Sequence, residues 1–225
     1  MNWLKKNYNF QAISESIDEL VILDATRNHK KIDCFAGAVK EVTTGVFAPL
    51  SAGGGIRSLE SAELLLHSGA DKVVLNTAIT RSPDLVSELV NLYGSQCIVA
   101  SVDYKRVNNT LHVFIDNGQN DTGICLNDYL YMIAKLNCGE VYLNSIDRDG
   151  TGMGYDIDIL KDIIRDVSVP IILAGGAGNS KHLIEGINTP GVDATATANL
   201  LNFLNDGLPI ARMEMLKHGV DLAVW

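Results

Sequence analysis

Two glycine-rich segments of this chain lie in the same sequence context, one in each half. Ser51–Ser58 (SAGGGIRS) is similar to Leu173–Ser180 (LAGGAGNS), and each segment follows an apolar run and precedes a helical pattern. Downstream of each come Gly-Ala-Asp or Gly-Val-Asp and another apolar run, and upstream Val21–Asp24 matches Val141–Asn144. An internal repeat of this length predicts a fold made of two halves with the same architecture.

Seven apolar runs rich in Val, Ile and Leu alternate with amphipathic segments along the chain. The predicted strands are Leu20–Leu23, Ala48–Ala52, Lys72–Leu75, Cys97–Val102, Glu140–Leu143, Pro170–Ala174 and Val192–Thr197. The predicted helices, with apolar residues at three- and four-residue steps, include Leu59–His67, Pro83–Leu92, Asp128–Leu136, Asp158–Arg165 and Lys181–Ile187. Apolar runs joined by helices are typical of buried parallel strands. The polar segment Lys105–Thr122 predicts a loop, with Leu111–Ile115 as a candidate hairpin strand.

The repeat also predicts how many strand–helix units the fold has and which of them correspond. Units one to three correspond to units five to seven, and the fourth, Cys97–Asp103, has no counterpart in the first half. A duplicated (βα)4 half-barrel would have one more strand before residue 1. We therefore expect an α/β fold, a TIM (βα)8 barrel of two half-barrel repeats lacking its first β-strand in this chain. It would form a single, N-terminally incomplete domain over residues 1–225, since an open doubly wound sheet does not predict two matching glycine loops.

Composition excludes several other classes. Of the 225 residues 47% are hydrophobic and 20% are charged, which argues against disorder. No apolar stretch reaches the roughly 18–20 residues of a membrane span, and we expect no signal peptide because the first residues contain no apolar run before a small-residue cleavage site. A net charge of −9 without basic clusters argues against nucleic acid as a partner. We expect a cytoplasmic protein without a metal site, whose cysteines are buried free thiols: Cys34, Cys97, Cys125 and Cys138.

Glycines at strand ends point to anion binding. In a barrel of this type the chemistry lies at the carboxyl ends of the strands. Glycines let backbone N–H groups approach an anion, and the helix that follows contributes a favourable dipole. We expect one phosphate at each loop, bound by Gly54, Gly55, Asn76 and Thr77 in the first half and by Gly176, Gly178 and Asn199 in the second. The matching ligand is a molecule with a phosphate at each end.

Asp103 is the candidate catalytic residue at the carboxyl ends of the predicted strands. It closes an apolar run, where a carboxylate costs desolvation unless it faces a solvated mouth. Taken alone, a salt bridge with Lys105 or a capping role explains Asp103 equally well. Its place between two phosphate loops favours a general acid or base.

Three further residues near the carboxyl ends of the predicted strands are candidate ligand contacts. Asp149 and Gly150 suit substrate hydroxyls or a closing loop, and the alternative is a turn neutralised by Arg148 between two aspartates. Asp24 ends the first apolar run and is either a ligand contact or an N-cap.

Charged residues also stand just before several strands, at the opposite edge. They are Glu19, Asp71, Lys72 and Glu140. An ordinary solvated rim explains them, and a gate or a docking surface is the functional alternative.

Short motifs spread over nearly the whole chain match one enzyme family. They are Asp18–Asp24, Gly53–Ile56, Gly69–Val73, Asn76–Ala78, Tyr93–Gln96, Val102–Arg106, Asp121–Ile124, Ser145–Thr151, Gly154–Asp156, Gly175–Gly178 and Lys217–Val220. In these motifs the chain resembles the cyclase subunits of imidazole glycerol phosphate synthase. The related isomerase of the same pathway shares the glycine loops but not Tyr93–Gln96 or Asp121–Ile124.

The resemblance implies a (βα)8 barrel in a heterodimer with a glutaminase subunit, without a cofactor. Ammonia from the glutaminase would pass through the barrel and attack a bisphosphorylated formimino-aminoimidazole carboxamide ribonucleotide. The products would be imidazole glycerol phosphate and aminoimidazole carboxamide ribonucleotide, in histidine biosynthesis. By resemblance, Asp103 matches a catalytic aspartate. Glu19, Lys72 and Glu140 match a charged gate at the ammonia entrance, and Asp71 matches a position facing the glutaminase.

Several positions depart from the family pattern. The family's first strand, with its own catalytic aspartate, would precede residue 1. Asn144 and Asn199 stand where threonine and serine are usual, Ala174 replaces a serine, and Asp116–Asn120 lacks lysines. Such drift is typical of divergent copies associated with amidino-sugar synthesis for surface polysaccharide. The sequence thus leaves three hypotheses: a cyclase-lyase, an ammonia-channelling partner in sugar amidination, and a non-catalytic truncated paralogue.

Overall fold

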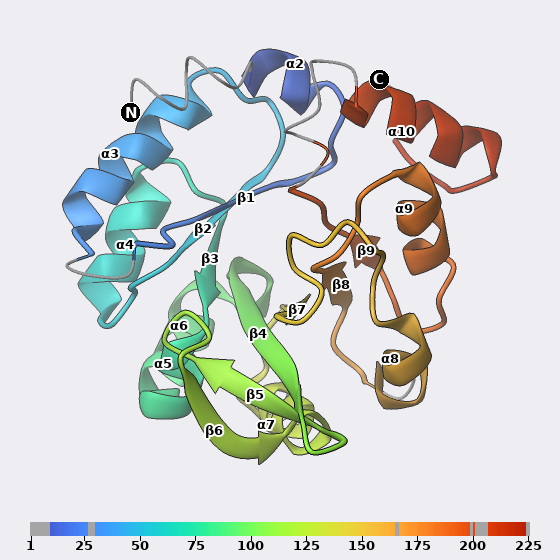
Figure 1. The fold of residues 1–225 in the computed structure, drawn as a ribbon. Helices are drawn as coiled ribbons and strands as arrows, with labels where there is room; N and C mark the ends of the chain where they lie inside the picture. Colours follow the sequence, from blue (N-terminus) through green and yellow to red (C-terminus); the bar gives the residue numbers. More distant parts are fainter. Residues whose placement is uncertain (1–9, 27–29, 165–166, 199, 201–206, 224–225) are drawn as a thin grey trace. The chain divides into compact units, whose positions relative to one another are not determined.

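The computed structural model describes residues 10–26, 30–164, 167–198, 200 and 207–223 (Figure 1). The chain divides into two compact units, Met1–Val99 with Leu222–Trp225 (unit 1) and Ala100–Asp221 (unit 2). Among the described residues, no helix is long and apolar enough to span a membrane.

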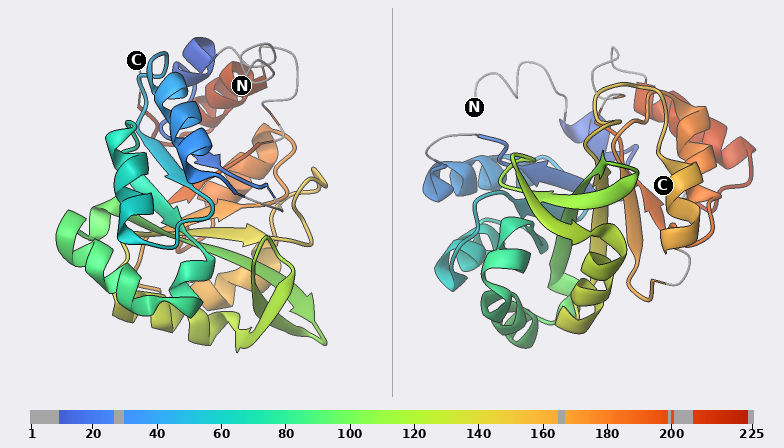
Figure 2. Two further views of the ribbon diagram at one scale, coloured as in Figure 1. Left: turned by 90° about the vertical axis from the view of Figure 1, so that its left-hand side faces the viewer. Right: turned by 60° about the horizontal axis from the view of Figure 1, so that its bottom comes forward.

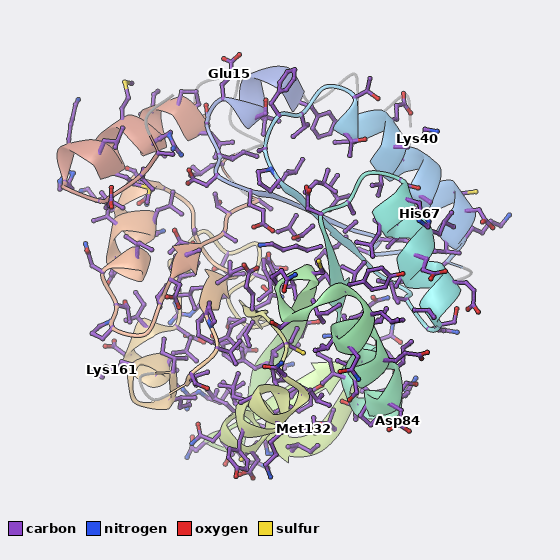
Figure 3. The ribbon with its side chains drawn as sticks, turned by 180° about the vertical axis from the view of Figure 1, so that it is seen from behind. Glu15, Lys40, His67, Asp84, Met132 and Lys161 are labelled. Atoms are coloured by element: carbon purple, nitrogen blue, oxygen red, sulfur yellow. The ribbon has the colours of Figure 1, made fainter. Side chains whose placement is uncertain are left out.

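Unit 1 is a series of parallel strand–helix units. Its strands β1 (Leu20–Leu23), β2 (Leu50–Gly53) and β3 (Lys72–Leu75) lie in the sheet in chain order. Helices α3 and α4, which carry the labelled Lys40 and His67 in Figure 3, pack against each other on one side of these strands. The helical segments are α2 (Phe10–Ser14), α3 (Ile32–Thr43), α4 (Leu59–His67), α5 (Thr77–Arg81), α6 (Pro83–Tyr93) and the 3-10 helix η1 (Ser95–Cys97).

Unit 2 continues the alternation and adds a hairpin. Strands β4 (Ile98–Val107, which begins in unit 1), β7 (Glu140–Ser145), β8 (Ile171–Ala174) and β9 (Ala194–Thr195) follow chain order in the sheet. The antiparallel strands β5 (Thr110–Ile115) and β6 (Asn120–Cys125) extend from β4, and α7 packs against both of them (Figure 2). The helices are α7 (Leu126–Leu136), α8 (Ile157–Ile164), α9 (Ser180–Ile187) and α10 (Gly207–Lys217). Parallel strands in chain order that alternate with helices, with the hairpin inserted after β4, confirm the predicted TIM-like α/β fold.

Both glycine-rich segments end in a helix cap. The hydroxyl of Ser58 accepts a hydrogen bond of 3.4 Å from the backbone N–H of Ser61 at the start of α4. The amide oxygen of Asn179 accepts one of 3.2 Å from the N–H of His182 at the start of α9. Such caps satisfy N–H groups that the first helical turn leaves without a partner. Local sequence therefore fixes where each loop ends and its helix begins.

The strand pairing corrects the repeat alignment by one residue. Pairing of β1 with β2 begins at Leu20, and pairing of β7 with β8 begins at Val141. Counted from these residues, the structural equivalent of Asp24 is Ser145, whereas the sequence match pairs it with Asn144. Side chains alternate between the two faces of a strand, so this shift changes which face the equivalent residues share.

Two predictions around β4 are wrong. Asp103 does not end its strand, since β4 continues to Val107. Most of Lys105–Thr122 is not a loop but the end of β4 and the hairpin, and only Leu111–Ile115 was expected to be a strand. The candidate hairpin strand Leu111–Ile115 is confirmed as most of β5, in which Leu111 and Val113 are buried, whereas β6 has no buried residue and was missed.

The prediction that all four cysteines are buried is also wrong. Cys138 is buried, whereas Cys97 and Cys125 are half-buried and Cys34 is exposed. Cys34 lies on the solvent side of α3, whose other side buries Ala36, Val39 and Val42. All four are free thiols.

Candidate functional site

Asp103 and Asn144 meet at one edge of unit 2. The amide Nδ2 of Asn144 donates a hydrogen bond of 2.9 Å to Oδ1 of Asp103. Burial alternates along β7, so Asn144 shares a strand face with Glu140 and Tyr142. A Cβ atom built on Gly175 would lie 2.8 Å from Oδ1 of Asn144, so the glycine loop after β8 packs directly on this amide. Asn144 therefore connects the Asp103 carboxylate to the second glycine loop.

The ionisable groups around Asp103 affect one another's pKa values. Burial raises the pKa of Asp103 above its ordinary value, the hydrogen bond from Asn144 lowers it, and the charge of Asp149 raises it. Burial, Asp149 and Asp103 together raise the pKa of Tyr142 to about 12, so its phenol stays protonated at neutral pH. A half-buried carboxyl with a raised pKa is typical of groups that transfer protons.

The loop that carries Asp149 and Gly150 is anchored by a buried carboxylate. Asp156, 8% exposed, accepts hydrogen bonds from Nε of Arg148 (2.8 Å) and the hydroxyl of Ser145 (3.1 Å). Arg148 thus pairs with Asp156 rather than with the two aspartates beside it in sequence. Asp149 and Gly150 are exposed above this anchor, and their proposed contacts with substrate remain predictions.

In the second glycine loop one predicted phosphate contact already has a partner. The N–H of Gly178 donates a hydrogen bond of 3.1 Å to Nδ1 of His182, so an anion there would displace this imidazole. The carbonyl of Gly176 accepts a hydrogen bond of 2.8 Å from the N–H of Gly154, which joins the loops after β7 and β8. Asn199, the remaining contact predicted here, lies outside the described residues.

The first glycine loop has a lysine that the sequence did not single out. Nζ of Lys30 donates a hydrogen bond of 2.6 Å to the carbonyl of Asp24, and the alkyl chain of Lys30 lies against Gly55. The carboxylate of Asp24 accepts a hydrogen bond of 2.9 Å from the N–H of Thr26 in a local turn, and the N-cap alternative is wrong because Lys31 is the N-cap of the next helix, α3. Lys30 thus places a positive charge beside the loop in which we expect a phosphate.

The two glycine loops approach the preceding strand end in the same way. A Cβ atom on Gly54 would lie 2.5 Å from the carbonyl oxygen of Asp24, and one on Gly175 would lie 2.7 Å from that of Ser145. Only glycine fits so close to a backbone. Asn76 and Thr77 directly follow β3, which runs parallel to β2, so they lie at the same edge of unit 1 as Gly54.

Glu19 and Lys72 form an ion pair at the opposite edge of unit 1. Nζ of Lys72 lies 2.7 Å from Oε2 of Glu19, and the hydroxyl of Ser51 donates a hydrogen bond to Oε1. Both charged side chains are half-buried. Glu140, the equivalent of Glu19 in the corrected register, begins β7 in unit 2. The gate role of these three residues remains a prediction.

Asp71 has a structural role that its equivalent Asp193 shares. Asp71 accepts a hydrogen bond from the N–H of Leu50 through Oδ2 (2.8 Å) and donates its own N–H to the carbonyl of Leu50 (2.8 Å). Asp193 makes the same two bonds, each of 2.9 Å, with Ile171. Each aspartate thus connects the position just before one strand to the first residue of the neighbouring strand.

Asp71→Ala and Asp193→Ala are each expected to lower the free energy of unfolding by about 1–3 kcal/mol, because each leaves a buried N–H without its acceptor. Denaturant unfolding would measure this, with Glu88→Ala on the exposed side of α6 as a control near zero. Asp71→Asn keeps an acceptor oxygen, so it should retain stability. Equal stability of Asp71→Ala and the parent protein would contradict the structural role.

The fold and the site together define a TIM-like α/β protein with glycine loops at its strand ends and a half-buried carboxyl on β4. The model of the family described as "Histidine biosynthesis protein" matches residues 7–205. A protein provisionally named imidazole glycerol phosphate synthase subunit hisF2, from Parasynechococcus marenigrum (strain WH8102), is 42% identical over 224 residues, 99% of this chain and 83% of that protein. The chain therefore belongs to the histidine biosynthesis protein family, and its resemblance to the cyclase subunits is confirmed.

Sequence reasoning missed Tyr142, Lys30 and His182. Only Tyr142 carried a usable signal, because strict alternation along β7 places it on the face of Asn144. The contacts of Lys30 and His182 depend on how their loops fold back, which no local pattern in the sequence encodes.

Proposed function

We propose that this protein is the ammonia-dependent cyclase of an imidazole glycerol phosphate synthase. Its substrate would be the bisphosphorylated formimino-aminoimidazole carboxamide ribonucleotide, and its products imidazole glycerol phosphate and aminoimidazole carboxamide ribonucleotide. The observation that carries the proposal is the Asp103 carboxyl, held by Asn144 against the glycine loop after β8. This arrangement provides a proton-transfer group next to backbone that can approach a phosphate.

Asp103 acts as the general base in this proposal. Its carboxylate takes a proton from the reacting nitrogen, while the Asn144 amide fixes its orientation and stabilises its charged form. Gly54, Gly55, Asn76 and Thr77 would bind one phosphate, with Lys30 adding a positive charge, and Gly176 and Gly178 would bind the other. Tyr142, a neutral phenol at neutral pH, would line the same strand face.

The ammonia would come from a glutaminase subunit. The relative from Parasynechococcus marenigrum is named as a subunit of the synthase, which supports a partner for this chain as well. We assign Glu19, Lys72 and Glu140 to ammonia entry and Asp71 to the docking face. Asp71→Asn, which keeps its structural acceptor, should weaken glutaminase binding by removing the charge.

Removing the Asn144 amide is expected to shift the pH dependence of turnover. A base works only when ionised, so kcat/KM falls as the pH drops through the raised pKa of Asp103. Asn144 lowers that pKa, so Asn144→Ala should move the acid limb to higher pH. The measurement is kcat/KM against pH with free ammonia held constant. An unchanged limb would show that Asn144 does not tune the base.

Ammonium-driven turnover of the ribonucleotide, followed by the release of imidazole glycerol phosphate, tests the proposal directly. Growth of a strain lacking its histidine cyclase, when it carries this gene, supports the same conclusion in cells. The absence of both, with glutaminase binding retained, would overturn the cyclase proposal in favour of the ammonia-channelling partner. Loss of glutaminase binding too would contradict both.

A further inference from the structure

His182 folds back over the glycine loop that follows β8. Its Nδ1 atom accepts a hydrogen bond of 3.1 Å from the backbone N–H of Gly178. The ring also lies against the loop after β7, because a Cβ atom built on Gly154 would lie 3.3 Å from Cδ2 and 3.5 Å from Nε2 of His182. The half-buried imidazole therefore contacts both loops of unit 2 at which we expect the substrate to bind.

The bond from Gly178 determines which nitrogen of the imidazole carries a proton. Nδ1 of His182 accepts this bond, so it holds no proton in the neutral ring. One nitrogen of a neutral imidazole is always protonated, which makes Nε2 an N–H donor. The neutral ring presents this donor without taking up a further proton.

A second donor lies beside Nε2. The amide oxygen Oδ1 of Asn179 accepts the backbone N–H of His182 at 3.2 Å, so the other amide atom, Nδ2, is an NH2 group. Nδ2 of Asn179 lies 3.5 Å from Nε2 of His182, and two donors cannot satisfy each other. Within the part of the chain that the structure describes, neither atom has a protein acceptor. Two such donors side by side suit a ligand that only accepts hydrogen bonds, such as an oxyanion.

The structural roles of these side chains leave the two donor atoms unexplained. The cap of α9 uses only Oδ1 of Asn179, and the bond to the glycine loop uses only Nδ1 of His182. A metal ion requires lone pairs, which neither donor offers. An anion on the N–H of Gly178 would displace the imidazole, whereas an anion on the two donors leaves that bond intact.

We propose that Nε2 of His182 and Nδ2 of Asn179 bind the second phosphate of the substrate, beside the glycine loop after β8. The assignment rests on the proposed function, whose substrate has a phosphate at each end. Gly178 would then contribute through His182, because it fixes the orientation and the protonated nitrogen of the ring. Hydrogen bonds to a charged acceptor are stronger than those to a neutral one, so the two donors select a phosphate over a hydroxyl group.

The first test separates the two nitrogen atoms of His182. His182→Asn puts an amide oxygen near the place of Nδ1 and no donor at Nε2, whereas His182→Gln puts an amide nitrogen near Nε2 and no acceptor at Nδ1. In ammonium-driven turnover, His182→Asn is expected to raise the KM of the ribonucleotide about 10–100-fold, with kcat changed less than threefold. His182→Gln should recover part of this loss, whereas a purely structural role predicts the opposite order. His67→Asn, at the exposed end of α4, is the matched control and should leave both constants unchanged.

The second test uses the charge of the ligand. Asn179→Asp keeps the cap of α9, because Asp and Asn cap helices about equally well. It also gives Nε2 of His182 an acceptor, so the melting temperature should not fall. The new carboxylate would repel a phosphate, so KM should rise more than tenfold, and calorimetry with inorganic phosphate should detect one site fewer than in the parent protein. Asn91→Asp makes the same charge change on the exposed side of α6 and should leave both measurements unchanged.

The outcomes distinguish this inference from the proposed function. A His182→Asn variant with the KM of the parent protein, or a lower one, overturns the phosphate contact and leaves the cyclase proposal standing. So does an Asn179→Asp variant that binds inorganic phosphate as the parent does. A parent protein that binds phosphate through these residues but shows no turnover contradicts the cyclase proposal and supports the phosphate contact.

Discussion

Asp103→Asn is expected to lower ammonium-dependent turnover by about 10²–10⁴-fold, because it removes the general base but keeps the shape of the side chain. The asparagine oxygen can still accept the hydrogen bond from Asn144, so the site should keep its geometry. Substrate affinity, measured by calorimetry on the non-reacting variant, should change little. Asp147→Asn makes the same chemical change on the neighbouring loop, at an exposed residue, and serves as the matched control.

The same substitution should raise stability. The folded-state pKa of Asp103 lies above that of the unfolded chain, since burial disfavours the charge. Between these two pKa values the folded state holds more protons, so stability falls as the pH rises through this window. At neutral pH the half-buried carboxylate therefore costs stability, and the neutral asparagine avoids this cost. A variant that keeps its turnover, whatever its melting temperature, would contradict the catalytic assignment.

Gly176→Ala is expected to lower the free energy of unfolding by about 3–5 kcal/mol, the range of severe single substitutions. Gly176 has a φ of +114°, which L-residues rarely adopt. A Cβ atom there would overlap the carbonyl oxygen of Gly154 and lie 3.0 Å from Cβ of Arg148. The alanine would therefore push apart the loops that follow β7 and β8, and we expect phosphate binding to weaken with them.

Gly219→Ala separates the two causes of that loss. Gly219 also has a positive φ, +79°, but a Cβ atom there would meet nothing within 4 Å. It should cost only the backbone strain, about 1–2 kcal/mol. Denaturant midpoints of the two variants give the comparison. Equal midpoints would mean that the contact with Gly154 relaxes at little cost.

The class of fold could be predicted because its signals are local. Burial of parallel strands requires apolar runs, and amphipathic helices show their period within a few turns. The prediction of Leu59–His67 matches α4 at both ends, and Leu20–Leu23 and Lys72–Leu75 match β1 and β3. In the hairpin, the candidate strand Leu111–Ile115 matches most of β5, whereas β6 could not be predicted because it buries no side chain and shows no apolar alternation.

The residues of the site can be divided in the same way, into those with a local sequence signal and those without one. Asp103 and the glycine loops could be selected from the sequence, because each directly follows an apolar run. The partners of Asp103 could not, because Asn144 lies 41 positions away and reaches it only through strand pairing. The contact of His182 with Gly178 likewise depends on how the loop after β8 folds back.

By itself, the sequence of this protein determined the parallel α/β architecture, its internal repeat and the strand ends that carry glycines and carboxylates. Only the tertiary structure decided that Asp24 corresponds to Ser145, that Arg148 pairs with Asp156, and that Asn144 donates to Asp103. The physical reason is that the periodicity of apolar residues determines each helix or strand, whereas the register between strands determines which residues contact each other. A shift of one residue moves every side chain of a strand to the other face.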